Sequence, residues 1–395
     1  MTSRTAWAKS ELEELANGGR LVPIRTIETA QGAWISIEGK PVLNMCSNNY
    51  LGLANNPEVV RASQEATSKF GMGAGAVRSI AGTNSLHAKL EEELASFKHF
   101  GSSLVYQGGL LANLGSIPVL VGKDDLVISE ELNHASIIDG VRLSSAKRAV
   151  YKHLDMGDLR NQLTEHRKDG KKTLIVTDGV FSMDGDIAPL PEIAELGEEF
   201  DSMVYVDDAH GEGVLGDHGR GIVDHFKLSG KVDIEMGTFS KALGGMGGFV
   251  ASDEDVIRLM KQRSRPFLFS SALNPGDTAA ISKSLEIMSK DDSALKRLWS
   301  NAKRLKDGLL SEGYDLGNSK TPITPVMVGD EKKTLELSKS LYQESRVFAS
   351  PIVFPTVARG MARIRLMPSA VHSTDDIDFA VESFRQQGKK LAILK

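Results

Sequence analysis

The middle of this sequence alternates short apolar runs with helical patterns, and this alternation restricts the fold more than any other feature. Five runs have the composition of β-strands: SLVY (103–106), LVIS (126–129), RAVY (148–151), TLIVTD (173–178) and MVYVDD (203–208). They are continuously apolar, which is typical of parallel strands covered on both faces. The segment LPEIAELGEEF (190–200) predicts a crossover helix between the last two strands. We therefore predict a doubly wound, mostly parallel α/β domain over residues 47–285.

The two ends of the chain have a different pattern. Residues 1–46 predict an N-terminal helix and a hairpin that turns at Glu38 and Gly39. Residues 286–395 predict a smaller α+β domain, with helices at 291–314 and 375–394 and strands at 323–329 and 362–367. We see no internal repeat and no low-complexity segment.

Composition excludes several classes of function. The 395 residues carry a net charge of −5, which argues against a general nucleic-acid binder. No apolar run approaches the roughly 20 residues of a membrane-spanning helix. The N-terminus lacks the apolar core of a signal peptide. The single cysteine, Cys46, favours a reducing compartment. We expect a cytoplasmic protein with neither a membrane nor a nucleic acid as partner.

Ligands of open α/β sheets bind beyond the carboxyl ends of the strands, so polar residues at those ends are the candidates for a site. Asp207 and Asp208 end one predicted strand, and His210 follows. A buried carboxylate needs a cation or a strong donor as partner. Strand alternation points only one of the two aspartates toward a ligand, and the sequence leaves open which one. The ordinary alternative is an exposed loop with a helix cap.

Two further strand ends carry polar residues. His134 follows LVIS, either as a cap or core residue or as an imidazole stacked on an aromatic cofactor. The segment TDGVFSMDGDIAPL (177–190) carries Ser182 and several aspartates around two glycines. Its spacing does not match a twelve-residue calcium loop, so we expect no metal.

The segment TFSKALGGMGG (238–248) places Lys241 between small hydroxyl residues and glycines. A second glycine turn, at Gly108 and Gly109, precedes a helix whose N-terminus can receive a phosphate. It matches neither the dinucleotide fingerprint nor the P-loop. A lysine that forms a Schiff base and an aspartate that holds a pyridinium nitrogen are the groups that pyridoxal phosphate requires. The segments together therefore predict pyridoxal 5′-phosphate as the cofactor.

Seven segments in this order make the chain resemble the α-oxoamine synthases, pyridoxal-phosphate enzymes of fold type I. They are SNNYLGLANNP (47–57), LNHASIIDGVRLS (132–144), VFSMDGDIAPL (180–190), VYVDDAHGEGVLG (204–216), GTFSKALGG (237–245), RSRPFLFSS (263–271) and ARIRLMPSAVH (362–372). Within the family, the chain looks most similar to the glycine C-acetyltransferase branch.

The resemblance implies a role for each candidate residue. Lys241 would carry the cofactor and move the proton, Asp207 would pair with the ring nitrogen, His210 would bond the phenolic oxygen, and His134 would stack on the ring. The remaining cofactor contacts would come from Ser182, Gly109, Leu110, Thr238 and, from a partner subunit, Ser271. Asn48 and Arg365 would hold the amino-acid carboxylate. Strand periodicity alone cannot choose between Arg363 and Arg365, which share a face.

The resemblance also implies a reaction. We expect a homodimeric acyltransferase, with its active site at the interface, that condenses glycine with acetyl-CoA to 2-amino-3-oxobutanoate, as in threonine degradation. The alternative within the family is an 8-amino-7-oxononanoate synthase, which joins alanine to a pimeloyl thioester with loss of CO₂, or an enzyme of broad specificity. An aminotransferase or aldolase would share Lys241 and Asp207 but not the ordered segments.

Overall fold

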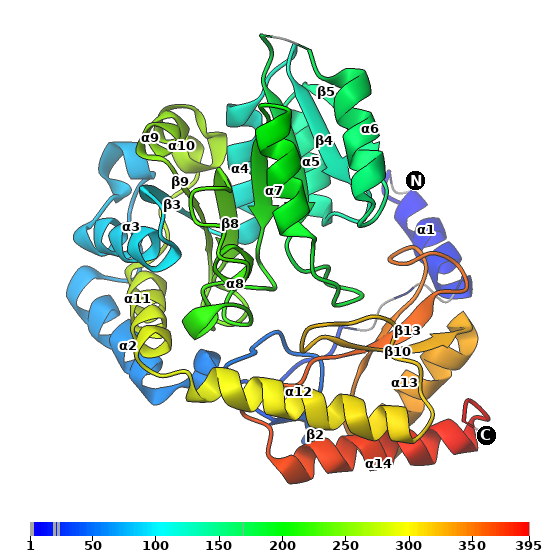
Figure 1. Ribbon diagram of the computed structural model, residues 1–395. Helices are drawn as coiled ribbons and strands as arrows, with labels where there is room; N and C mark the ends of the chain where they lie inside the picture. The colour runs from blue at the N-terminus through cyan, green and yellow to red at the C-terminus, as the bar shows by residue number, and fades with distance from the viewer. Residues whose placement is uncertain (1–3, 19–20, 22–23, 169, 395) are drawn as a thin grey trace.

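A computed structural model describes residues 4–18, 21, 24–168 and 170–394. Its centre is a seven-stranded sheet in the order β3-β9-β8-β7-β6-β4-β5 (Figure 1). Five of these strands lie within a residue or so of the predicted positions: β3 (Ser102–Tyr106), β4 (Leu126–Glu130), β5 (Lys147–Tyr151), β6 (Thr173–Asp178) and β7 (Met203–Asp207). The predicted α/β class is therefore confirmed.

The sequence analysis missed two strands of this sheet, β8 (Ile234–Thr238) and β9 (Gly248–Ser252). Strand β8 continues the parallel series beside β7, whereas β9 runs antiparallel to both β8 and β3. The turn between β8 and β9 carries Lys241. The two strands therefore present the lysine at the same edge of the sheet as Asp207.

Helices cover both faces of the sheet. They are α2 (Pro57–Phe70), α3 (Ser85–Lys98), α4 (Gly109–Leu120), α5 (Ala135–Leu143), α6 (Met156–His166), α7 (Leu190–Glu199), α8 (Ile222–His225), α9 (Glu254–Arg263), α10 (Arg265–Phe269) and α11 (Pro275–Lys290), with short turns η1 (Leu53–Asn55), η2 (Arg78–Gly82) and η3 (Asp217–Gly219). The sheet residues alternate between two buried clusters, one containing Ile175 and Val206 and the other Val176 and Tyr205. The continuous apolar composition of the strands follows from this burial on both faces.

The small domain lies below the large sheet in Figure 1. Its antiparallel sheet has the order β10 (Thr324–Gly329), β13 (Ala362–Leu366), β12 (Ser350–Ile352), and it packs with α12 (Ser293–Ser311), α13 (Glu331–Ser345) and α14 (Thr374–Lys390). Within the described residues, no helix is long and apolar enough to cross a membrane.

The N-terminal segment joins this small domain. Helix α1 (Trp7–Asn17) precedes the hairpin of β1 (Trp34–Ile37) and β2 (Lys40–Asn44), which turns at Glu38 and Gly39. Strand β2 pairs with β11 (Val347–Phe348), and Leu43 and Met45 lie in the core of the small domain. The small domain is thus built from both ends of the chain.

Candidate active site

A cavity of about 190 Å³ lies at the carboxyl ends of β6, β7 and β8, where Lys241 is found. It brings together eight of the predicted site residues: Gly109, Leu110, His134, Ser182, Asp207, His210, Thr238 and Lys241. Asp178 and Ser240, from two of the segments singled out above, also line it, and the structure adds Ser136. Asn48, Arg365 and Ser271 are not among the residues that line this cavity.

Lys241 lies in a tight turn between β8 and β9. Burial lowers the pKa of its ammonium group to about 8, although the Asp207 and Asp178 carboxylates act in the opposite direction. The glycines after it keep the turn compact: Gly244 has φ of 73°, and a Cβ there would lie 2.3 Å from the backbone nitrogen of Ala54. A lysine amine that loses its proton near neutral pH can act as a nucleophile toward an aldehyde and as a base.

The structure separates the two adjacent aspartates. Asp207 lines the cavity, and its carboxylate accepts hydrogen bonds from Asn113 Nδ2 at 2.7 Å and from the Ala209 backbone at 3.1 Å. Asp208 points away and accepts from the Ile222 backbone at 2.9 Å. Asp207 is therefore the aspartate that can meet a ligand in the cavity, because a strand turns successive side chains to opposite faces.

His134 caps α5 at the rim of the cavity. Its Nδ1 lies 2.7 Å from Ser136 Oγ and 3.2 Å from the Ser136 backbone nitrogen, and its own backbone N–H donates to Asp178 at 2.7 Å. Burial and the neighbouring Asp207 carboxylate raise the pKa of Asp178 well above its usual range. The imidazole is thus held in a fixed orientation over the cavity.

His210 is positioned by a residue that the sequence analysis quoted but did not single out. Its Nδ1 lies 2.8 Å from the hydroxyl of Tyr50, which is fully buried. Burial lowers the pKa of His210, and the Lys241 and Arg365 cations lower it further. Burial also raises the pKa of the Tyr50 phenol, so the phenol keeps its proton and can donate it to Nδ1. The remaining N–H of a neutral imidazole is then at Nε2.

The third wall of the cavity can hold a phosphate. Gly109 and Leu110 begin the twelve-residue helix α4, whose first backbone N–H groups lack partners within the helix. Thr238 Oγ1 and Ser240 Oγ lie 3.0 Å apart beside this terminus. A Cβ at Gly109 would lie 3.2 Å from Thr238 Oγ1, so the absence of a side chain keeps the wall open. These donors, Lys241 and Asp207 together fit pyridoxal phosphate.

The structure distinguishes the two arginines of β13. Arg363 forms an ion pair with Asp184 and donates to the Met183 carbonyl at 3.3 Å. Among the described residues, Arg365 has no carboxylate partner: its terminal nitrogens approach Asn48 Oδ1, each at 3.5 Å, and its Nε has no acceptor. A buried guanidinium without a counter-ion is suited to receive an anionic ligand.

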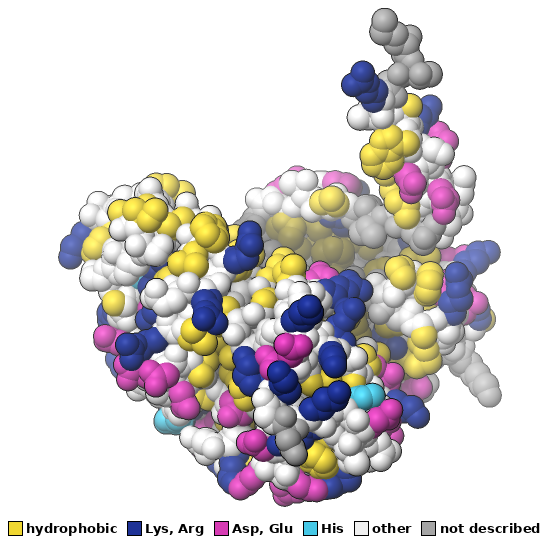
Figure 2. All heavy atoms as spheres, turned by 90° about the horizontal axis from the view of Figure 1, so that it is seen from above, with side chains coloured by type: hydrophobic (Ala, Val, Ile, Leu, Met, Phe, Trp, Pro, Cys, Tyr) yellow, Lys and Arg dark blue, Asp and Glu magenta, His cyan; other side chains and the backbone are white. Residues whose placement is uncertain are grey.

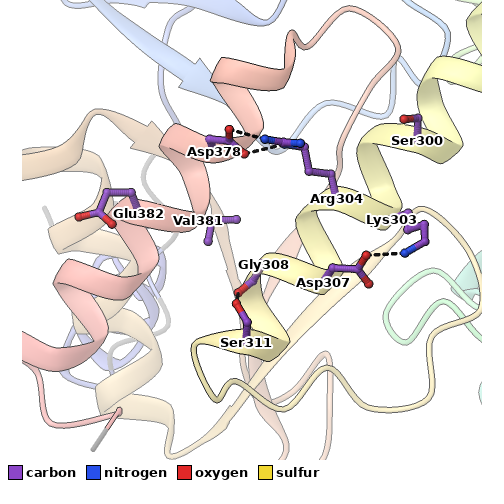
Figure 3. A pocket seen from close by; sticks show the side chains of 9 residues that line it. All are labelled: Ser300, Lys303, Arg304, Asp307, Gly308, Ser311, Asp378, Val381 and Glu382. Carbon is purple, nitrogen blue, oxygen red and sulfur yellow. Dashed lines mark hydrogen bonds and ion pairs between the residues drawn. The ribbon is translucent and has the colours of Figure 1, made fainter.

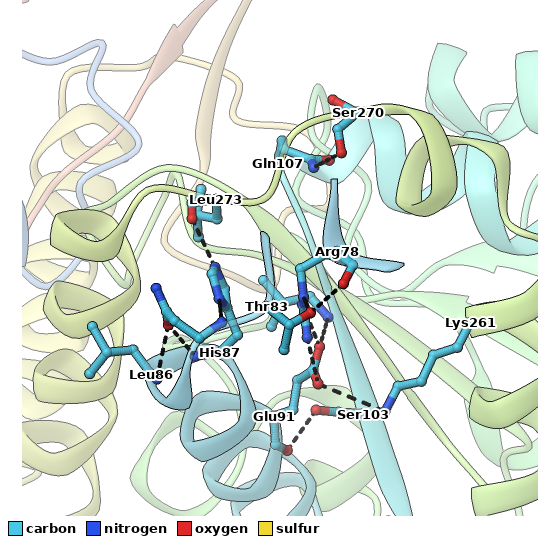
Figure 4. Close-up of polar contacts among 12 residues, drawn as sticks. Arg78, Thr83, Leu86, His87, Glu91, Ser103, Gln107, Lys261, Ser270 and Leu273 are labelled. Atoms are coloured by element: carbon cyan, nitrogen blue, oxygen red, sulfur yellow. Dashed lines mark hydrogen bonds and ion pairs between the residues drawn. The ribbon is translucent and has the colours of Figure 1, made fainter. Parts of the chain in front are cut away.

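Ser271 lies outside the cavity of its own chain. It is exposed and pairs with Val77, and its carbonyl accepts from Gln107. Gln107 also donates to the neighbouring Ser270 carbonyl at 3.4 Å (Figure 4). A buried ion pair, Arg78 with Glu91 at 2.8 Å, fixes the neighbouring segment to α3, and His87 Nε2 binds the Leu273 carbonyl at 2.8 Å. The segment that carries Ser271 is therefore tied to its neighbours by several hydrogen bonds, and it does not line the cavity of this chain's Lys241.

A second cavity of about 540 Å³ borders the first. Ser182 lines both, and the other walls come from the loop after β6 and from the small domain, chiefly Phe181, Met183, Phe354, Pro355 and Val357. Its two cationic side chains already have acidic partners, Arg363 with Asp184 and His153 with Glu130 at 2.7 Å. The cavity is mainly apolar and opens beside the site of Lys241.

A groove of about 770 Å³ between α12 and α14 lies away from these groups (Figure 3). Arg304 pairs with Asp378 at 2.6 Å, and Lys303 pairs with Asp307. Because these charges face one another on an exposed surface, the groove has no converging unpaired polar groups and is not a candidate active site.

A cluster of buried charges lies on the other side of the Asp207 strand end. Lys98 of α3 forms ion pairs with Glu212 at 3.2 Å, Asp208 at 3.8 Å and Glu235, and none of the four side chains is more than 1% exposed. Burial raises the pKa of Glu212 to about 7, despite the opposing effect of Lys98. We call this set the Lys98 cluster; it packs under the loop that carries His210.

The chain matches the family model "Aminotransferase class I and II" over residues 40–384. It is 56% identical over 384 residues to the 8-amino-7-oxononanoate synthase of Thermosipho melanesiensis, covering 97% of this chain and 98% of the relative. It is 55% identical to the protein of the same name from Petrotoga mobilis, with 98% of each chain covered.

Solved structures of similar proteins have the same fold. The serine palmitoyltransferase of Sphingomonas wittichii superposes with a TM-score of 0.94 at 30% identity over 100% of both chains. A structure of SPT with PLP has the same TM-score at 31% identity and covers 100% of both chains. The 8-amino-7-oxononanoate synthase of Francisella tularensis gives 0.76 at 27% identity over 88% of this chain and 98% of the other.

These relatives contradict the prediction of a glycine C-acetyltransferase and of a role in threonine degradation. They favour the alternative, an 8-amino-7-oxononanoate synthase. The physical reason for the error is that most of the quoted segments line the cofactor cavity. A cofactor site is common to all branches of such a family, whereas acyl and amino-acid preference depends on side chains elsewhere.

Proposed function

The chain belongs to the aminotransferase class I and II family, in which it is an α-oxoamine synthase with pyridoxal 5′-phosphate as its cofactor, and we propose that it joins L-alanine to a pimeloyl thioester. The products would be 8-amino-7-oxononanoate, CO₂ and the free thiol. The observation that carries this choice is that the Lys241 cavity shares Ser182 with a second, mainly apolar cavity of about 540 Å³. An acetyl group would leave most of that cavity unfilled.

The proposed cofactor contacts use the residues of the first cavity. The α4 terminus at Gly109 and Leu110, with Thr238, would hold the phosphate, Asp207 the ring nitrogen, and His210 and Ser182 the phenolic oxygen. Pyridoxal phosphate supplies an aldehyde for the lysine amine and an electron sink for the carbanion formed at Cα. His134 would restrict the ring to one plane from its position on the rim of the cavity.

Arg365 and Asn48 would hold the carboxylate of alanine. The unpaired guanidinium presents parallel donors, which fix the plane of a carboxylate as well as its position. This orientation would aim the Cα–H bond of alanine at Lys241 Nζ. An amine whose pKa is lowered to about 8 can take that proton near neutral pH and return it later.

The second cavity would take the acyl chain of the thioester. With its carbonyl carbon placed beside Ser182 and His210, Cα attacks that carbon, the new C–C bond forms as the C–S bond breaks, and the thiol leaves. The single His210 Nε2–H, shared with the phenolic oxygen that Ser182 also holds, would stabilise the negative charge that develops on the carbonyl oxygen. The carboxylate then leaves as CO₂, and Lys241 supplies the proton that Cα regains.

We also propose that the enzyme acts as a homodimer. Ser271 pairs with Val77 and does not line the Lys241 cavity of its own chain, and it would instead serve that of a second copy. The surface around it exposes Phe269 (75%) and Ile80 (82%). Helix α1 buries none of its residues against its own chain and stands away from the body of the molecule (Figure 2). Exposed apolar groups of this kind mark protein interfaces.

Borohydride reduction of the yellow holoenzyme followed by peptide mapping tests the cofactor assignment. We expect the pyridoxyl group on Lys241, and Lys241→Ala to lose both the label and turnover. Release of labelled CO₂ from carboxyl-labelled alanine tests the reaction. A pyridoxyl group on another lysine, or a product that keeps the carboxyl label, would contradict the proposal.

A further inference from the structure

A continuous series of hydrogen bonds, buried except at its His134 end, connects Asp207 with His134. It runs through the side chains of Asn113 and Ser136, neither of which carries an assigned role. Asn113 is fully buried, and its Nδ2 donates to Asp207 at 2.7 Å and to Ser136 Oγ at 2.9 Å. These hydrogen bonds therefore link the carboxylate that would face the ring nitrogen to the imidazole at the rim of the cavity.

The orientation of the Asn113 amide is determined by the Asp207 carboxylate, because a hydroxyl can either donate or accept whereas a carboxylate accepts. With Nδ2 toward Asp207, Tyr205, also fully buried, donates its hydroxyl proton to Asn113 Oδ1 at 2.7 Å. If the amide were reversed, its oxygen would face the Asp207 carboxylate, and two acceptors would lie against each other. Because buried donors and acceptors must be matched, only the orientation with Nδ2 toward Asp207 satisfies all three contacts.

The same bonding fixes the hydrogen positions at His134. Ser136 Oγ already accepts from Asn113, so its own O–H is free to donate to His134 Nδ1, 2.7 Å away. The Ser136 backbone N–H points at the same nitrogen from 3.2 Å. A nitrogen that receives two donors carries no hydrogen, so the imidazole hydrogen is at Nε2.

We propose that Asn113 is a positioning residue that orients the hydrogen-bonding groups at both ends of this series of hydrogen bonds. It directs an N–H at Asp207, which holds that carboxylate in a fixed plane for the ring nitrogen. Through Ser136 it directs a donor at Nδ1 of His134, so that the imidazole presents Nε2–H and a fixed face to the cofactor ring. The proposal relies on pyridoxal phosphate as cofactor but not on the identity of either substrate.

Three variants separate this role from simple packing. Asn113→Ala removes both donors, whereas Asn113→Asp keeps the shape and replaces the donor by an oxygen that repels Asp207. Ser116→Ala is the matched control: Ser116 lies one helical turn further along α4, is fully buried, and contacts Tyr205 at 2.9 Å without reaching Asp207. All three are compared after thermal unfolding of the cofactor-free protein has shown that they fold.

The readouts do not require the correct substrates. In ¹⁵N-histidine-labelled protein without cofactor, we expect the wild-type resonances of His134, assigned with His134→Gln, to show hydrogen on Nε2 only. We expect Asn113→Ala and Asn113→Asp each to raise the dissociation constant of pyridoxal phosphate at least tenfold, and Ser116→Ala to change it less than twofold.

Two results would overturn the proposal: a His134 resonance with hydrogen on Nδ1, or an Asn113→Asp variant that binds the cofactor as tightly as the wild type. If the enzyme proved to use other substrates than alanine and a pimeloyl thioester, both readouts would be unaffected. Failure of the proposed function is therefore distinguishable from failure of this inference.

Discussion

Replacing Lys98 by methionine should destabilise the protein strongly, and increasingly so as the pH rises. The substitution removes the only cation that ion-pairs with Asp208, Glu212 and Glu235 among the described residues, and leaves their buried carboxyls facing one another. Removing one partner of a buried ion pair costs roughly 3–5 kcal/mol. Without the lysine charge, the folded variant would relieve the repulsion by binding a proton on one of these carboxyls. At pH 7 that costs about 3.7 kcal/mol for a carboxyl of ordinary pKa, which agrees with that range.

The pH dependence follows from the proton that replaces the lysine charge. The folded variant binds about one proton more than the wild type, while both unfolded chains bind the same number on their carboxyls. A folded state that holds an extra proton loses stability as the pH rises, by about 1.4 kcal/mol per pH unit. The penalty of Lys98→Met should therefore be larger at pH 7 than at pH 6.

Urea unfolding at pH 6 and pH 7, followed by fluorescence and by circular dichroism, measures this difference in the free energy of unfolding. The measurement applies where the two probes give the same unfolding transition, which is the test of two-state behaviour. Lys306→Met is the control, because within the described part of the chain Lys306 donates to the neutral Ser319 carbonyl and hydroxyl and Thr321 carbonyl and has no carboxylate partner. Burial lowers the pKa of Lys306 to about 8, so its removal should give nearly the same penalty at pH 6 and pH 7. A Lys98→Met penalty below about 1 kcal/mol, or one that does not change with pH, would refute the reasoning.

Asp207→Asn should lower kcat at least a hundredfold, on the order of 2.7 kcal/mol, because an amide cannot stabilise a pyridinium charge; steady-state turnover near that of the wild type would contradict the assignment. Arg365→Lys should raise the KM for the amino acid at least tenfold, about 1.4 kcal/mol, and leave the thioester KM nearly unchanged. Arg363→Lys should do much less to the amino-acid KM, because its partner is Asp184; equal effects of the two variants would count against Arg365. Tyr50→Phe removes the donor to His210 and should lower kcat several-fold with the amino-acid KM unchanged, which initial rates over a range of alanine concentrations would show.

The large sheet could be predicted from the sequence because burial on both faces leaves a continuous apolar run in each strand. Polar residues and glycines interrupt or border the two missed strands: β8 contains Glu235 and Gly237, and the short apolar run of β9 follows the glycine turn at Gly247 and Gly248. A buried glutamate is compatible with a strand only because Lys98 reaches it from α3. No local pattern carries that information.

The candidate site could be predicted only in part, because the sequence marks residues at strand ends but not contacts between residues far apart in the chain. Lys241 and Asp207 stand out because they end strands, where a sheet presents its ligands. Asn113 and Tyr50 do not stand out, because their partners are 94 and 160 positions away in the chain. The strand period could not choose between Arg363 and Arg365; the family resemblance favoured Arg365, and the structure pairs Arg363 with Asp184. A search for polar residues one turn after the Gly109 helix start would have found Asn113.

Substrate preference is the part that the sequence pattern predicted wrongly, and it is also the central claim to test. The most direct measurement compares kcat/KM for L-alanine with pimeloyl-CoA against glycine with acetyl-CoA, with the products identified by mass. The account predicts that the first pair is preferred at least a hundredfold and that its product has lost the alanine carboxyl carbon. Preference for glycine with acetyl-CoA, with 2-amino-3-oxobutanoate as the product, would contradict it.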